Sequence, residues 1–417
     1  MIAVLPNNKN GISTVPTKKK KSTRQYDITV FGATGFTGKL TIEYLAKHAP
    51  KLKLAIAGRD QNKLLALKNE LVALDRRNEQ IGVEIASIDD EASMANLAEK
   101  TQVLATTVGP YMHYGEAAVK ACADKGTDYL DLTGEPEFVD TMYRKYDTVA
   151  RATKARIIHC CGFDSIPHDL GVLYAVQQLN EQVDDMVRKK VVVNGYVRAG
   201  GKISGGTWHS AVNAFSRMTK TLSPKQSWMN LTRGKEIDGR RIITAKPVIF
   251  YHRKLKSWAV PFPTIDGQVV RRSAELFEQY GRNFTYGHNV LVKNLPKVLM
   301  GLSGVSAIMA LSQFNWTKQK LLDWMPQGEG PTMSERERAW FKVVIRARCD
   351  SHSVMATVKG GDPGYGETSK MLAESAITLV KDRDHLESVY GVLTPAAAMG
   401  NHLIDRLQDA GIRFSVE

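Results

Sequence analysis

Residues 27–38 read DITVFGATGFTG, a short apolar strand that runs directly into three glycines spaced three residues apart. Gly32 permits a tight turn, Gly35 lets the backbone approach a pyrophosphate, and Gly38 allows close packing of a helix on the strand. A helix that starts here would also point its unpaired N–H groups and its positive dipole end at the phosphates. This pattern predicts a dinucleotide-binding turn. The residues expected to bind the cofactor there are Gly32, Thr34, Gly35, Phe36, Thr37 and Gly38.

Strand and helix patterns alternate regularly after this turn. The short apolar strands are expected at residues 27–31, 53–57, 83–87, 103–108, 129–132 and 156–161. Short, almost uniformly apolar strands separated by helices are typical of a parallel sheet covered on both faces. Because crossovers between parallel strands are right-handed, the sequence predicts an α/β fold with a doubly wound parallel (Rossmann) sheet.

The pattern changes beyond residue 171. Longer strand-like runs at 187–197, 338–348 and 352–359, with less regular connections, predict a second, mixed α+β domain. Helical patterns return near the C-terminus, and Thr394, Pro395 and Gly411 mark the ends of the last helix.

The expected organisation has three parts. They are a disordered basic tail (1–25), a nucleotide-binding domain (26–175) completed by C-terminal helices (365–417), and a substrate domain with a mixed sheet (176–364).

The composition is that of an ordinary globular protein, which excludes collagen-like, low-complexity and wholly disordered chains. The net charge is +14, but residues 1–26 hold six basic and no acidic residues, so the body carries +8. That excess suits an anionic small molecule, and no motif for reading nucleic acid is present. The four cysteines include no CxxC pair, which argues against a metal site and a disulfide framework and favours a cytoplasmic protein.

The second strand indicates which dinucleotide binds. It ends in Ala57-Gly58-Arg59-Asp60, where an NAD site usually places an acidic residue for the ribose 2′-hydroxyl. Arg59 is positioned instead to meet a 2′-phosphate with its forked guanidinium group, while Asp60 fits the cap of the following helix. The sequence therefore favours NADP(H) over NAD(H).

Two further strand ends supply candidates for catalysis. The fourth strand runs into Gly109, Pro110 and Tyr111, which should flank the nicotinamide because ligands lie beyond the carboxyl ends of parallel strands. Tyr111 and the nearby Tyr114 could donate a proton, although both could equally belong to a surface turn. The sixth strand runs into Asp164, Ser165 and His168, where helix capping competes with a catalytic role. The catalytic candidates are Tyr111, Tyr114, Ser165 and His168.

Two other stretches remain open to different interpretations. The glycine-rich residues 200–207 could direct N–H groups at an anion or an enolate oxygen, or could form a simple turn. Residues 298–311 are apolar throughout but shorter than the ~20 residues of a membrane-spanning helix. We expect a buried core helix there, and the alternative is a lipid-facing segment that would make the protein peripheral to a membrane.

With these residues in view, the chain resembles the saccharopine dehydrogenase-like oxidoreductases, and within them the branch called trans-acting enoyl reductases. The segments that carry the resemblance are VFGATGFTG (30–38), AGR (57–59), VGPYMHYGEAAVKACADKGTDYLDLTGE (108–135), CGFDSIPHDLG (161–171), SGGT (204–207), GDPGYGETSKMLAES (361–375) and GVLTPAAAMG (391–400). The resemblance implies an NADP-binding Rossmann domain, a substrate domain and C-terminal helices that return to the first domain. Many relatives read DSIPSD where this chain has His168.

The same resemblance implies a function. It is the NADPH-dependent reduction of the C=C bond of an enoyl thioester in lipid or polyketide metabolism, with the acyl chain presented by an acyl carrier protein or a synthase. Tyr111 or Tyr114 would then donate the proton, and Ser165 with residues 204–207 would orient the acyl group. The alternatives are a reductase of an imine or carbonyl, and a non-catalytic NADP-binding protein that uses residues 298–311 at a lipid surface. The sequence also leaves open whether the chain forms a homo-oligomer.

Overall fold

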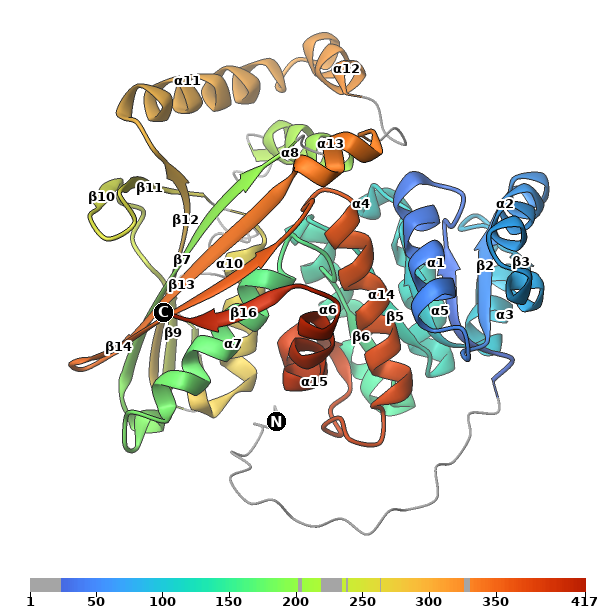
Figure 1. Ribbon diagram of the computed structural model, residues 1–417, viewed down its shortest axis with the longest axis horizontal. Coiled ribbons are helices and arrows are strands. Elements are labelled where there is room, and N and C mark those ends of the chain that lie inside the picture. Colours follow the sequence, from blue (N-terminus) through green and yellow to red (C-terminus); the bar gives the residue numbers. More distant parts are fainter. Residues whose placement is uncertain (1–23, 202–204, 219–234, 238, 263, 326–330) are drawn as a thin grey trace.

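Two β-sheets form the framework of the computed structural model, with helices packed around and between them (Figure 1). The structure describes residues 24–417 except 202–204, 219–234, 238, 263 and 326–330. Most of the predicted basic tail lies outside the described residues. Arg24, however, is anchored, since its guanidinium donates to the carbonyls of Ala98 (2.7 Å) and Lys125 (2.6 Å).

The first sheet has seven strands, all parallel, in the order β15-β6-β5-β4-β1-β2-β3. Their bounds are β1 Tyr26–Phe31, β2 Leu54–Gly58, β3 Gly82–Ile85, β4 Thr101–Thr106, β5 Asp128–Leu130, β6 Arg156–Ile158 and β15 Gly391–Leu393. The order of the first six is that of the doubly wound dinucleotide-binding sheet, which confirms the predicted fold class. The seventh strand comes from near the C-terminus.

Helices cover both faces of this sheet. They are α1 Phe36–His48, α2 Gln61–Leu74, α3 Glu91–Lys100, α4 Tyr111–Tyr114, α5 Glu116–Lys125, α6 Pro136–Thr153, α14 Gly366–Lys381 and α15 Pro395–Asp409, with the 3₁₀ turn η1 at Arg76–Gln80. Ile28 and Val30 of β1 pack toward α1, α2 and α14, whereas Phe31 packs toward α3, α5 and α6. Both faces are buried, which explains why the strands read as continuous apolar runs.

The second sheet is mixed, as predicted. Its strands run in the order β10-β11-β12-β7-β13-β14-β16, and β9 pairs with β12 and β8. The β7–β12 and β9–β12 pairs are parallel, and the others are antiparallel. The bounds are β7 Lys190–Gly200, β8 Lys235–Ile237, β9 Arg240–Thr244, β10 Phe250–His252, β11 Ser257–Pro261, β12 Asn283–Val292, β13 Trp340–Cys349, β14 His352–Gly360 and β16 Arg413–Val416.

Further helices accompany this sheet. They are α7 Ile166–Asn180, α8 Gly205–Met218, α10 Asp266–Leu276, α11 Leu295–Leu311, α12 Asn315–Trp324 and α13 Met333–Arg338, with 3₁₀ turns η2 at Met186–Arg188 and η3 at Glu278–Tyr280. Helix α7 follows β6 of the first sheet in the sequence, but it packs on β13 and β14 of the second sheet. The boundary expected at residue 175 therefore falls inside a helix.

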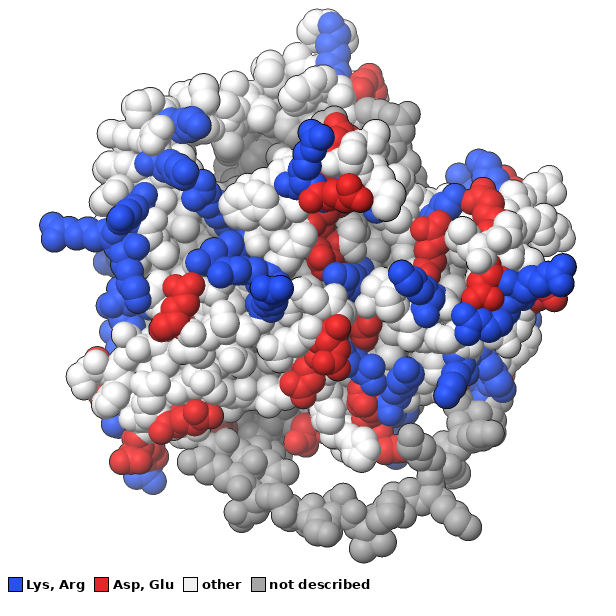
Figure 2. Space-filling model, viewed as in Figure 1, with Lys and Arg blue, Asp and Glu red and all other residues white. Residues whose placement is uncertain are grey.

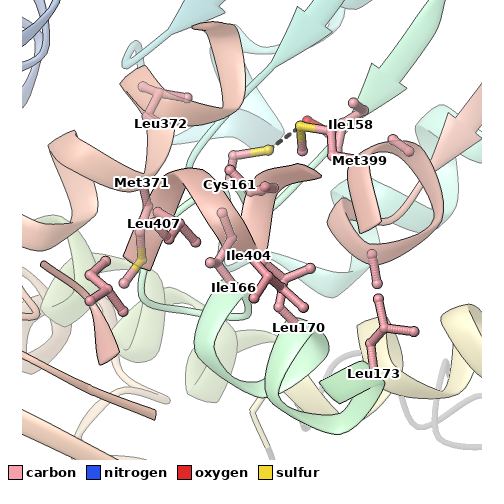
Figure 3. Packing of buried hydrophobic residues seen from close by; sticks show 14 of the residues in the cluster. Ile158, Cys161, Ile166, Leu170, Leu173, Met371, Leu372, Met399, Ile404 and Leu407 are labelled. Atoms are coloured by element: carbon pink, nitrogen blue, oxygen red, sulfur yellow. Dashed lines mark hydrogen bonds between the residues drawn. The ribbon is translucent and has the colours of Figure 1, made fainter. Parts of the chain in front are cut away.

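A continuous apolar core joins the two sheets. Helices α7, α14 and α15 meet between them, and the buried side chains of Ile166, Leu170, Ile404 and Leu407 lie together there (Figure 3). Fully burying side chains of this size contributes about 1.5–3 kcal/mol each. The two sheets are therefore held as one packed body rather than linked only by the chain.

The expectation of a buried core helix at 298–311 is wrong. This segment forms most of α11, and among its residues only Val298 is buried. An apolar run indicates only that side chains avoid water, because periodicity cannot distinguish a core helix from one whose partner lies outside the chain. Among the described residues, no helix combines the length and apolarity needed to cross a membrane.

A buried carboxylate ties α7 to the last helix. Asp169 accepts hydrogen bonds from Ser273 Oγ of α10 (2.5 Å) and from the N–H of Ala396 at the start of α15 (2.8 Å). Burial raises the pKa of Asp169 to about 7, although both hydrogen bonds favour its ionised form. Thr394 Oγ1 caps α15 by accepting from the N–H of Ala397 (3.2 Å), as the sequence predicts.

We expect Asp169→Ala to lower the free energy of unfolding by about 2–4 kcal/mol, because two buried donors would lose their acceptor. Urea denaturation followed by circular dichroism measures the change. Asp405→Ala, on the exposed side of α15, is the matched control and should change stability by less than about 0.5 kcal/mol. Equal stability of the two variants would contradict the role given to Asp169.

Candidate active site

The predicted glycine turn lies between β1 and α1 and requires its glycines. Gly32 has φ +83°, and a Cβ added at Gly38 would overlap the carbonyl oxygen of Gly32. Gly35 precedes the first residue of α1, and neither a capping side chain nor an acidic residue occupies that first turn. The first N–H groups of α1 therefore have no intrahelical partners and can bind an anion. The turn fits a pyrophosphate.

The strand order reverses beside this turn, because β1 lies between β2 and β4. Thr107, just after β4, donates its hydroxyl to the Gly32 carbonyl (3.1 Å), and Val108 Cγ2 lies 2.6 Å from where a Gly32 Cβ would stand. The loop of Gly109 and Pro110 therefore begins against the glycine turn. A dinucleotide bound across such a reversal places its two halves on opposite sides of it.

Arg59 and Asp60 divide their roles as the sequence suggests. Asp60 caps α2 by accepting a hydrogen bond from the N–H of Lys63 (3.1 Å). Arg59 is exposed at the end of β2 and makes no hydrogen bond or ion pair with other described residues. A guanidinium in this position is available to a 2′-phosphate.

Tyr111 holds the loop after β4 in place. Its hydroxyl donates to the Thr106 carbonyl (3.1 Å) and accepts from the N–H of Leu132 (3.2 Å). Burial raises its pKa well above the ordinary value, and the charge of Asp131 adds to the effect. Glu135 accepts from the backbone N–H of Tyr111 (3.0 Å) and therefore fixes the start of α4. With its hydroxyl buried and already bonded, Tyr111 lacks the free O–H that a proton donor needs.

Tyr114 differs from Tyr111. It lies at the end of α4, its side chain is exposed, and its ring centroid is 6.1 Å from that of the adjacent His113. Nothing in the described structure ties it to a second catalytic group.

Ser165 occupies a strained position. It is fully buried with φ +143°, in the region that favours glycine, and it precedes α7 without capping it. Its hydroxyl has no hydrogen-bond partner among the described residues. Backbone strain and an unsatisfied buried hydroxyl both cost free energy, and they cluster at functional sites.

His168 belongs to a buried group built from three elements. Its Nδ1 lies 2.9 Å from Asp266 Oδ1 of α10, out of line for a hydrogen bond, and its ring centroid lies 4.6 Å from that of His288 of β12. Burial alone would raise the pKa of Asp266, but the two histidines outweigh it and hold that pKa below its usual range. Burial lowers the pKa of His288 to about 4, although the charge of Asp266 acts in the opposite direction.

Asp164 is the partly exposed member of this group. Its Oδ2 lies 3.5 Å from where a Cβ of Gly134 would stand, and it forms no hydrogen bond with the described residues. Burial and the neighbouring Asp266 charge raise its pKa to about 7, despite the opposite effect of His168. Gly134 precedes Glu135, which fixes the start of α4. Asp164 therefore lies beside the residues that hold the loop after β4 in place.

The glycine-rich stretch is described only in part. Residues 202–204 lie outside the described residues, as does the side chain of Thr207. The N–H of Gly205, which begins α8, donates to Tyr365 Oη (3.3 Å), and the Tyr365 ring meets Phe36 edge-on at 4.8 Å between centroids. The start of α8 is therefore linked to the cofactor turn through two aromatic rings.

Comparison with known proteins agrees with this geometry. Residues 28–158 match the model of the saccharopine dehydrogenase NADP binding domain. A putative trans-acting enoyl reductase of Mycobacterium tuberculosis is 33% identical, covering 93% of this chain and 97% of the relative. The human saccharopine dehydrogenase-like oxidoreductase is 31% identical, covering 94% of this chain and 97% of its own. The chain belongs to the saccharopine dehydrogenase-like oxidoreductase family.

A solved structure shows the same fold. Saccharopine dehydrogenase (L-Glu forming) from Saccharomyces cerevisiae superposes with a TM-score of 0.52 at 13% identity, over 94% of this chain and 99% of that one. Family membership and the glycine turn together make this protein an NADP-binding oxidoreductase, and its coenzyme is NADP(H).

Sequence reasoning missed three members of the site. Glu135 ends a segment that carries the family resemblance but is not singled out there, whereas Asp266 and His288 carry no motif and lie more than 90 residues from His168. Asp164 is a helix-cap candidate in the sequence, whereas in the structure its side chain does not cap α7 and the residue is partly exposed.

We expect Arg59→Ala to weaken NADPH binding about 10- to 100-fold, because the 2′-phosphate would lose charge-assisted hydrogen bonds. NADH affinity should change less than about twofold, since NADH lacks that phosphate. Calorimetric titration with each coenzyme measures both values. Lys51→Ala, an exposed charge near the other end of β2, is the control, and equal losses in both variants would contradict the assignment.

Proposed function

We propose that this protein reduces the C=C bond of an α,β-unsaturated acyl thioester with NADPH. The observation that carries the proposal is the charge around Asp164. The charges that shift the pKa of Asp164 are those of Asp266 and His168, and the charges that lower the pKa of Asp266 are those of His168 and His288, with no lysine or arginine among them. Such surroundings disfavour a carboxylate-bearing amino acid and accept an uncharged acyl group. Relatives named as trans-acting enoyl reductases support the same choice.

The residues divide into binding and catalytic groups. The glycine turn and Arg59 bind the coenzyme, which when bound supplies the hydride that adds to the β-carbon. The loop held by Tyr111 and Glu135 would orient the nicotinamide. Hydride addition moves the C=C electron pair onto the thioester oxygen as an enolate.

Asp164 completes the reduction by giving a proton to the α-carbon. Its carboxyl group is partly exposed and unbonded to described residues, so its proton is free to leave. Ser165 and His168 act as positioning residues, because the strained backbone at Ser165 sets the direction of the preceding side chain. The Asp266 carboxylate behind them opposes ionisation of Asp164 and keeps the proton in place until it is used.

The acyl group is proposed to arrive on an acyl carrier protein or synthase. The names of the mycobacterial relatives carry the words "trans-acting". A body with net charge +8 would steer association with an acidic carrier, mainly through the association rate.

We expect Asp164→Asn to lower kcat on 2-enoyl thioesters by about 100-fold or more, which is the usual contribution of a positioned acid. NADPH affinity should stay within about twofold, because Asp164 lies outside the cofactor turn. NADPH oxidation followed by absorbance, with thioesters of several chain lengths, measures the effect. Asp89→Asn, on an exposed loop, is the matched control.

Three outcomes separate the alternatives. A wild-type rate for Asp164→Asn would remove Asp164 as the donor, and a loss confined to Tyr114→Phe would return the role to that tyrosine. Tyr111→Phe should lower stability more than turnover, since its hydroxyl only joins two backbone groups. Turnover of imines or carbonyls but not enoyl thioesters would overturn the proposed substrate class.

We further expect kcat to fall above about pH 7, approaching tenfold per pH unit. The raised pKa of Asp164 means that the carboxyl group keeps its proton up to about pH 7 and loses it above that value. A pH–rate profile at saturating NADPH tests this. The residual kcat of Asp164→Asn should not fall above pH 7. If the fall persists in that variant, it is caused by the titration of another group.

A further inference from the structure

Helices α11 and α12 form an apolar projection at one end of the molecule. Figure 1 shows them standing off the second sheet, above β12 and α8. We call residues 293–324 the α11–α12 hairpin. Met300 is 69% exposed and Trp316 is 70% exposed, values far above those of ordinary apolar side chains. The exposed large apolar residues of the hairpin are Leu295, Leu299, Met300, Leu302, Val305, Leu311, Phe314, Trp316 and Trp324.

The inner side of the hairpin is anchored to α8. Trp208 Nε1 donates to the carbonyl of Leu321 (2.5 Å), and His209 Nε2 lies 3.0 Å from the carbonyl of Leu322. Gln313 Nε2 donates to a backbone carbonyl of α8 at 2.9 Å. These contacts fix one side of the hairpin, so its outer apolar side is presented outward in a defined orientation.

The charge of the hairpin has one sign along most of its length. Residues 283–322 contain four lysines and no Asp or Glu, and Asp323 is the first acidic residue after them. Lys320 Nζ lies 3.9 Å from the centroid of the Trp316 ring. In Figure 2 the upper edge, where Figure 1 places α11 and α12, is mostly uncharged, with scattered basic side chains and an acidic patch near α12.

We propose that the α11–α12 hairpin docks on an anionic phospholipid bilayer. Its apolar side chains would enter the boundary between headgroups and acyl chains, and its lysines would lie among the phosphates. Tryptophan suits that boundary because its ring is apolar and its N–H is polar. The ligand is thus a lipid surface that carries negative charge, and the binding needs no catalytic step.

A second copy of this chain fits the surface less well. A twofold dimer through the hairpin would bring the same patch of both copies together and oppose two sets of four lysines. Like charges across an interface disfavour association, whereas anionic headgroups neutralise them. The charge pattern therefore favours lipid over self-association.

The test is sedimentation with vesicles of phosphatidylcholine alone and of phosphatidylcholine containing 30% phosphatidylserine (about one lipid in three, to supply a charged surface). We expect the full chain to bind the second type at least tenfold more tightly and to be released by high salt, because screening weakens the lysine contacts. Brominated lipid should also quench tryptophan emission, and Trp316→Phe/Trp324→Phe should lose most of that quenching.

Two double variants and one control variant test whether the hairpin itself binds the vesicles. Leu299→Glu/Met300→Glu should reduce vesicle binding at least tenfold, since charge would replace inserted apolar surface. Leu74→Glu, at an exposed leucine that ends α2 beside the first sheet, is the matched control and should bind as the wild type. Lys293→Glu/Lys297→Glu should remove the preference for phosphatidylserine.

Three results would overturn the proposal. They are no binding to either vesicle, binding that the hairpin variants leave unchanged, and a dimer in light scattering that these variants dissociate. NADPH titration of each variant verifies that it is folded, because the cofactor turn lies in the other sheet. Loss of enoyl reduction would leave this inference standing, since vesicle binding is measured without substrate.

Discussion

The structure depends on a close approach between the end of β1 and the start of α1. Gly38 lies against the carbonyl of Gly32 so tightly that a single added carbon would collide with it. This contact points the first N–H groups of α1 across the reversal of strand order and leaves room for a diphosphate. The loop after β4, anchored by Thr107 to the same carbonyl, is thereby brought to the other side of the cofactor position.

Much of the first sheet could be predicted because each strand is buried on both faces and carries its own local signal. The sequence does not predict strand β15, because Gly391–Leu393 is too short to show a period. It is a strand by virtue of its pairing with β6. The apolar run in α11 predicts a core helix, because hydrophobicity indicates which side chains avoid water without indicating what covers them.

The parts of the site also differ in how far the sequence predicts them. The cofactor turn is a local fingerprint, and Arg59 follows it at a predictable strand end. The acid–histidine group is assembled from α7 with the loop before it, α10 and β12, which are distant in sequence and leave no spacing to detect. Tyr111 shows the opposite case, because its residue type and position suggest chemistry while its hydroxyl serves the packing of the loop.

Residues 361–417 cross between the two halves of the molecule more than once. After β14, the chain passes through α14, β15 and α15 beside the first sheet and returns as β16 to pair with β14. Because this segment packs beside the first sheet and pairs with the second, the two halves are joined by more than one stretch of chain. They therefore cannot move apart as independent lobes. Entry and release of ligands would then depend on movements of loops and small displacements of helices. Deleting β16 would remove the pairing that returns this C-terminal segment to the second sheet.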